Sequence, residues 1–161
     1  MSSIGIDLQP HVKKGLLHFH ATRSSLYGLE MHLATMHKQI AEYQPRVVII
    51  DPLSNFTSVG SNVEVRSMLM RLIDLLKSQQ ITGLFTCLTS PGGSLEQTEV
   101  GVSSLMDTWI VLRSIEQTSK RDRQLHIIKS RGMAHSNQVA EFLLTSNGIR
   151  LLDVYVGRGQ D

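Results

Sequence analysis

The sequence predicts an α/β fold in which a central, mostly parallel β-sheet with flanking helices is followed by an antiparallel β extension. Two observations support this prediction. In the first half, short apolar runs alternate with amphipathic helical segments, as they do in βαβ units. In the second half, four short apolar runs are separated by polar turns and joined without predicted helices, which is typical of antiparallel strands.

The first half is expected to open with a buried strand at residues 16–20 and a helix at residues 27–43. Apolar residues recur in the helix at three-to-four spacing, and Pro45 ends it. Residues 47–50 are four consecutive β-branched side chains, a pattern typical of a central parallel strand that is covered on both faces.

A second strand and helix should follow. Residues 53–61 are rich in Ser, Asn and Gly and predict a loop, after which Asn62 is the expected N-cap of an amphipathic helix. Residues 83–88 predict another parallel strand, and the polar residues 89–101 predict an exposed, mobile loop. The four strands of the antiparallel extension are expected at residues 109–112, 125–128, 142–144 and 149–152.

Composition narrows the class of protein. A chain of 161 residues with 41% hydrophobic content is long enough for one core, so residues 1–161 are expected to form a single, partial domain. The 16 basic and 14 acidic side chains form no basic field, so nucleic acid is not an expected partner. The only cysteine, Cys87, lies in an apolar run and favours a reducing, cytoplasmic location. No apolar run approaches the roughly 18 residues of a membrane span.

The first candidate site residue is Asp51, which directly follows the strand predicted at residues 47–50. Ligands of open α/β sheets bind at the carboxyl ends of the strands, so this carboxylate would lie at the binding edge. Many parallel strands end in aspartate for structural reasons, and the position alone leaves both interpretations open.

The second candidate is the segment 129–132, Lys-Ser-Arg-Gly, followed by His135. Side chains alternate along a strand, so Lys129 and Arg131 are expected to project from the same face, where two cations suit a polyphosphate. Gly132 would allow the backbone to turn, and His135 would approach a base or ribose. A solvated basic edge is the alternative.

Four phrases of the sequence together resemble the KaiC-like ATPases of the RecA superfamily. They are VVIIDPLS at 47–54, ITGLFT at 81–86, MDTWIVL at 106–112 and KSRG at 129–132, in the order and at the intervals of that family. The resemblance covers residues 4–152 and is strongest to the second, autokinase-type domain of the clock protein.

The resemblance implies a role for several residues. Asp51 would be the Walker B carboxylate, acting on Mg²⁺ through water. Lys129, Ser130 and Arg131 would bind nucleotide, with the two cations reaching the ATP of a neighbouring copy in a hexameric ring. The resemblance thus implies ATP and Mg²⁺ as cofactors and copies of the chain, with signalling proteins, as partners.

Further positions follow from the same resemblance. His135 and the pair Thr145 and Ser146 would lie beside the adenosine, although the family often has Thr-Asp where Thr145 and Ser146 stand. Ser103 and Ser104 fall where the clock kinase carries its phosphorylated pair. A polar Ser-Ser loop is also common without any such role.

The chain departs from the family in one respect that decides its activity. No lysine follows a glycine anywhere, so the phosphate-binding loop Gly-x-x-x-x-Gly-Lys-Ser/Thr is absent, as is the adjoining Glu-Glu pair. We expect both upstream of Met1 in a longer protein, an ATPase or autokinase. The isolated chain is accordingly expected to be inactive and to bind no ATP or Mg²⁺. The alternative is a non-catalytic module for oligomerisation or signalling interactions.

Overall fold

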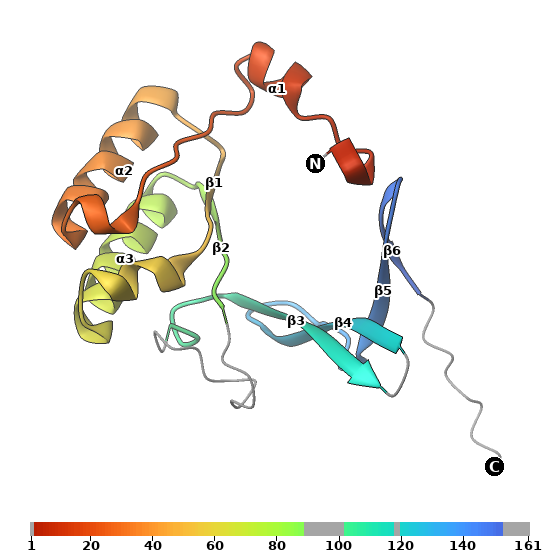
Figure 1. Ribbon diagram of the computed structural model, residues 1–161. Helices are drawn as coiled ribbons and strands as arrows, with labels where there is room; N and C mark the ends of the chain where they lie inside the picture. Colours follow the sequence, from red (N-terminus) through yellow and green to blue (C-terminus); the bar gives the residue numbers. More distant parts are fainter. Residues whose placement is uncertain (1, 89–101, 118–119, 153–161) are drawn as a thin grey trace. The chain divides into compact units, whose positions relative to one another are not determined.

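The computed structural model describes residues 2–88, 102–117 and 120–152, which fall into two units (Figure 1). The helical unit comprises residues 21–106, and the β unit comprises residues 1–20 and 107–161. The loop predicted at residues 89–101 lies outside the described residues. In the described ranges, no helix is long and apolar enough to cross a membrane.

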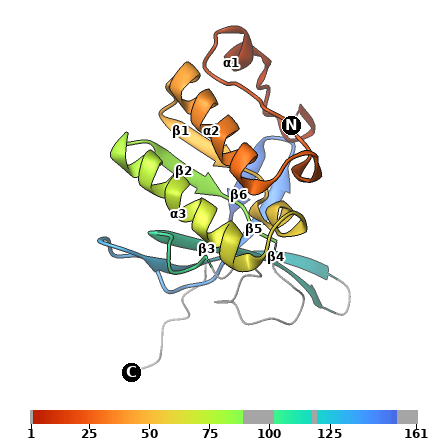
Figure 2. The ribbon, with the colours of Figure 1, turned by 90° about the vertical axis from the view of Figure 1, so that its left-hand side faces the viewer.

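The helical unit is a two-stranded parallel sheet with two helices on one face. Strand β1, Val47–Ile50, pairs with β2, Thr82–Phe85, so that Ile49 lies beside Leu84. Helix α2, Leu29–Tyr43, precedes β1, and α3, Asn62–Ser78, connects the two strands. Both helices lie on the same side of the strands in Figures 1 and 2. This order confirms the predicted helices, and β1 has the predicted bounds.

The core of the helical unit is built mainly by α3. Its buried side chains recur at three-to-four spacing, which places them on one face of the helix. Each fully buried side chain of this size contributes about 1.5–3 kcal/mol relative to an exposed one. The buried residues of α3 are Val65, Met68, Leu69, Leu72 and Leu76. Leu53 and Val102 are also almost fully buried.

Helix α3 begins with a capping box. The Glu64 backbone N–H donates to the Ser61 hydroxyl at 3.4 Å, and the Ser61 backbone N–H donates to the Glu64 carboxylate at 2.8 Å. The N-cap is therefore Ser61, and the prediction of Asn62 is wrong by one residue because Glu64 stands three positions after Ser61. The backbone N–H and hydroxyl of Ser61 hold the pKa of Glu64 below its usual value.

The second face of the β1–β2 sheet is exposed, and we call it the open face. It consists of Val47, Ile49 and Leu84, which are 52%, 60% and 52% exposed. Coverage of β1 on both faces was predicted, and this prediction is wrong for the chain by itself. Four β-branched residues in a row predict a buried strand, but the helices of this unit cover only the face of Val48 and Ile50.

The β unit contains an antiparallel sheet of four strands in the order β3-β4-β5-β6. The strands are β3, Thr108–Gln117; β4, Lys120–Ser130; β5, Ala140–Thr145; and β6, Gly148–Leu151. Each neighbouring pair is antiparallel, which confirms the predicted extension. The register shifts after Trp109, because Trp109 faces Lys129 whereas Ile110 faces Ile127.

The first residues of the β unit differ from the prediction. Residues 16–20 form no strand, and Leu16 and Phe19 are 73% and 64% exposed. An apolar run becomes a strand only where a neighbour supplies backbone partners, and no described strand pairs with this one. A short helix that was not predicted, α1 at Gln9–Lys13, begins with Pro10 in its first turn.

Candidate functional site

Asp51 lies at the carboxyl end of β1, beside the carboxyl end of β2. The Thr86 hydroxyl donates a hydrogen bond to Oδ1 of Asp51. The backbone N–H of Thr86 donates to the Ile50 carbonyl at 3.0 Å, and its carbonyl accepts from Leu53 N–H at 2.8 Å. The carboxylate is exposed and is held in place by the neighbouring strand, as expected for a ligand-binding position at a sheet edge.

Thr86, which bonds to the candidate residue Asp51, was not singled out from the sequence. It follows β2 as directly as Asp51 follows β1, and this shared position was the available signal. Carboxylate and hydroxyl oxygens are hard donors that suit Mg²⁺. In the described part of the chain, no three His, Cys, Asp or Glu side chains gather to hold a metal ion.

The segment 129–131 lies at the end of β4. The Ser130 and Thr108 hydroxyls are 3.0 Å apart, within hydrogen-bond distance, and the Arg131 backbone N–H donates to the Asp107 carbonyl at 2.8 Å. A guanidinium nitrogen of Arg131 lies 3.8 Å from Oδ1 of Asp107, and both side chains are more than half exposed. An exposed ion pair at this distance is weak.

The two cations are held differently. Lys129 is half-buried and lies in the strand opposite Trp109, whereas Arg131 is exposed and follows the last strand residue. The turn expected at Gly132 is confirmed by its φ of 73°, which a glycine adopts without strain. Asp107, the acidic neighbour of Arg131, was not singled out from the sequence as a site residue.

The remaining predicted binding residues belong to two turns of the β unit. Nδ1 of His135 lies 3.2 Å from the carbonyl oxygen of Ser136, in the segment between β4 and β5. The Thr145 hydroxyl donates to the Gly148 carbonyl at 2.9 Å and accepts from Asn147 N–H at 3.1 Å, so it shapes the turn between β5 and β6. Ser146, in the same turn, is exposed.

The residues predicted for phosphorylation lie in a turn of the helical unit. The turn is fixed at its start by Val102, which is 2% exposed, and by a hydrogen bond from Leu105 N–H to the Val102 carbonyl at 2.9 Å. Ser103 is half-buried and Ser104 is exposed. An Arg66 guanidinium N–H donates to the Ser104 hydroxyl oxygen at 3.1 Å, a contact that the sequence did not indicate.

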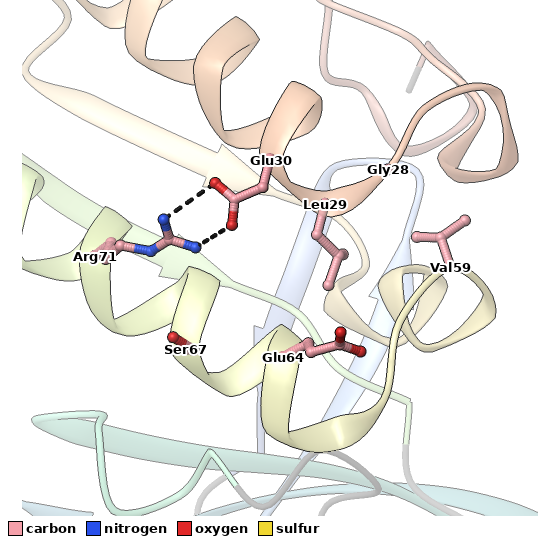
Figure 3. Close-up of a pocket in the computed structure, with 7 residues that line it drawn as sticks. All are labelled: Gly28, Leu29, Glu30, Val59, Glu64, Ser67 and Arg71. Carbon is pink, nitrogen blue, oxygen red and sulfur yellow. Dashed lines mark hydrogen bonds and ion pairs between the residues drawn. The ribbon is translucent and has the colours of Figure 1, made fainter.

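A cleft of about 270 Å³ lies between the first turns of α2 and α3 (Figure 3). None of the predicted site residues lines it. Arg71 donates to both carboxylate oxygens of Glu30, at 3.0 and 2.5 Å, and Glu64 is bonded to Ser61. Hydrogen bonds from Arg71 lower the pKa of Glu30, and the same pair raises the pKa of Arg71. Because its charged side chains already pair with neighbours, the cleft joins the two helices rather than presenting charges to a ligand.

Comparison with known proteins agrees with the sequence phrases. A protein-family model described as "ATPase: KaiC" matches residues 1–154. The chain belongs to the KaiC ATPase family. It is 49% identical, over 99% of its length, to a protein named circadian clock protein KaiC2 of Synechocystis sp. (strain ATCC 27184 / PCC 6803 / Kazusa). It is 32% identical, over 96% of its length, to the circadian clock oscillator protein KaiC of Thermostichus vulcanus.

The match covers a minor part of these relatives. The chain spans 28% of the Synechocystis protein and 30% of the Thermostichus protein. The KaiC family has a RecA-like α/β fold, and the two sheets described above, one parallel and one antiparallel, fit the predicted fold class. The family assignment therefore confirms the resemblance and the fold.

Proposed function

We propose that this chain forms part of an ATP-binding domain of the KaiC family, in which both units contribute to nucleotide sites. The observation that carries the proposal is the Asp51 carboxylate, held by Thr86 at the carboxyl ends of two parallel strands. In this role Asp51 would order the water shell of a phosphate-bound Mg²⁺. The metal would neutralise charge on the phosphates, and the chain's own residues would position it.

The β unit would supply Lys129 and Arg131 to the nucleotide of a neighbouring copy in a ring. Arg131 supports this role because its guanidinium is more than half exposed and its ion pair with Asp107 is long, at 3.8 Å. A guanidinium can donate two parallel hydrogen bonds to phosphate oxygens. It binds a phosphate in this way more strongly than it binds an exposed carboxylate at this distance. Ser130, His135, Thr145 and Ser146 would line the same nucleotide.

The chain cannot complete this site alone, because it contains no Gly-Lys sequence to cradle the phosphates. We propose that a strand, loop and helix outside this sequence supply the cradle and that the isolated chain is inactive. We also propose that Ser103 or Ser104 accepts a phosphoryl group from ATP in the complete, cytoplasmic protein.

The open face favours a second candidate function, a non-catalytic module that binds another protein chain. Three apolar side chains more than half exposed on one sheet face suit a protein contact. The two candidate functions differ in nucleotide binding. When this chain is joined to a phosphate-binding loop, the first function requires the protein to bind ATP and the second does not.

The proposed function is tested with the double substitution Lys129→Ala and Arg131→Ala in a complete KaiC-family protein that carries this sequence. We expect ATP hydrolysis to be lost while light scattering still detects the assembled ring, because the cations contact nucleotide rather than hold the fold. Arg113→Ala, which removes an exposed cation from β3, is the matched control. Unchanged turnover in the double variant would refute the assignment.

A further inference from the structure

We propose that Arg66 binds a phosphoryl group on Ser104, so that phosphorylation of this serine fastens the turn at residues 102–105 to helix α3. The inference rests on the proposed phosphorylation of the Ser103–Ser104 pair. It assigns the phosphoryl group to Ser104 and identifies Arg66 as the residue that binds it.

The geometry that supports the proposal lies within the helical unit. Nη2 of Arg66 is 3.1 Å from the Ser104 hydroxyl oxygen, although the two residues are 38 positions apart. Arg66 is the fifth residue of α3, so its position is fixed by a helix whose inner face is buried. The buried Val102 and the Leu105 to Val102 hydrogen bond anchor the turn that carries Ser104. The two side chains therefore meet between two anchored segments.

The charge of Arg66 favours an anion at this place. Its described partner is a neutral hydroxyl, whereas a guanidinium binds most strongly to carboxylates and phosphates. The nearby charged residues of α3 are already engaged, because Glu64 is bonded to Ser61 and Arg71 to Glu30. The first turns of α3 add the positive end of the helix dipole. A dianion on Ser104 would thus replace a neutral acceptor with a charged one.

The modification itself is an ordinary phosphoryl transfer. The Ser104 oxygen forms a bond to the γ-phosphorus of ATP as the bond to the ADP oxygen breaks, and the hydroxyl proton leaves to solvent. The product carries close to two negative charges and three strong acceptor oxygens. Two of these can accept from the fork of Arg66 in place of the single neutral contact. Ser103 is half-buried and is not the serine that Arg66 contacts.

The test uses the full chain with phosphoserine incorporated at position 104 during translation. Hydrogen exchange of the Leu105 amide, followed by NMR, reports opening of the turn, because this amide bonds to the Val102 carbonyl. We expect exchange to slow about tenfold on phosphorylation, the effect of one charge-assisted hydrogen bond. The slowing should disappear in Arg66→Gln and persist in part in Arg66→Lys.

Phosphoserine at position 103 is the control, and its effect should not depend on Arg66. Equal slowing in Arg66→Gln and in the unchanged protein, or no slowing at all with phosphoserine at 104, would overturn the inference. Because the modification is installed without ATP, the experiment does not require a working nucleotide site. Failure of the proposed function and failure of this inference are thereby distinguishable.

Discussion

Replacing all three residues of the open face by threonine should lower the free energy of unfolding most when another segment covers this face. Val47, Ile49 and Leu84 are 52%, 60% and 52% exposed, so about half of each side chain remains to be buried. Full burial of such a side chain is worth about 1.5–3 kcal/mol. Covering the exposed half of all three would therefore add roughly 2–5 kcal/mol, which is roughly 30-fold to several-thousand-fold in an equilibrium constant.

The assay is urea unfolding of four proteins: the chain alone, a fusion to a strand–loop–helix segment that carries a phosphate-binding loop, and the triple threonine variant of each. The loss of unfolding free energy on substitution should be larger in the fusion by roughly 2–5 kcal/mol. Val63→Thr is the matched control, because Val63 is 78% exposed on α3 and outside the open face. Equal losses in the chain and in the fusion would contradict the prediction made here that the added segment covers this face.

Two further predictions concern the helices. Ser61→Ala should lower the unfolding free energy in urea by about 1 kcal/mol, because α3 loses its N-cap acceptor, and Ser61→Asp should not; an unchanged midpoint in the alanine variant would contradict the capping role. Arg71→Gln should alter the dependence of thermal stability on pH. Arg71 lowers the pKa of Glu30, so the contribution of this pair is complete above the usual value of 4.5 and is lost as the pH falls through the lowered value. The difference in Tm between the unchanged protein and Arg71→Gln should therefore shrink as the pH falls below the lowered pKa of Glu30. A difference that stays constant with pH would show that the Glu30–Arg71 pair is not the source of the difference in Tm.

Local pattern was enough to predict most elements of the fold. Helices α2 and α3 follow from apolar spacing over many residues, and β1 follows from four β-branched residues. The prediction of a strand at residues 16–20 is wrong because a strand also needs a neighbouring strand to pair with, which no local pattern supplies. The capping box at Ser61 can be recognised in the sequence, since Glu64 stands three positions later, although Asn62 is also a residue type that favours the N-cap.

The candidate site was predictable in part, for the same reason. Asp51 could be identified from its place after a strand. Its partner Thr86 is 35 positions away, and the partner of Ser104 is 38 positions away, so neither pairing can be read from local spacing. These pairings depend on the parallel register and on the packing of a turn against α3, which arise only when distant segments meet.

The central claim is that this chain holds part of an ATP site and lacks its phosphate cradle. Isothermal titration with ATP and Mg²⁺ tests it most directly, comparing the chain alone with the fusion that carries a phosphate-binding loop. We predict no measurable heat of binding for the chain alone, and saturable binding for the fusion that is weakened by Asp51→Asn. Micromolar binding by the chain alone, or a fusion that never binds, would contradict the account.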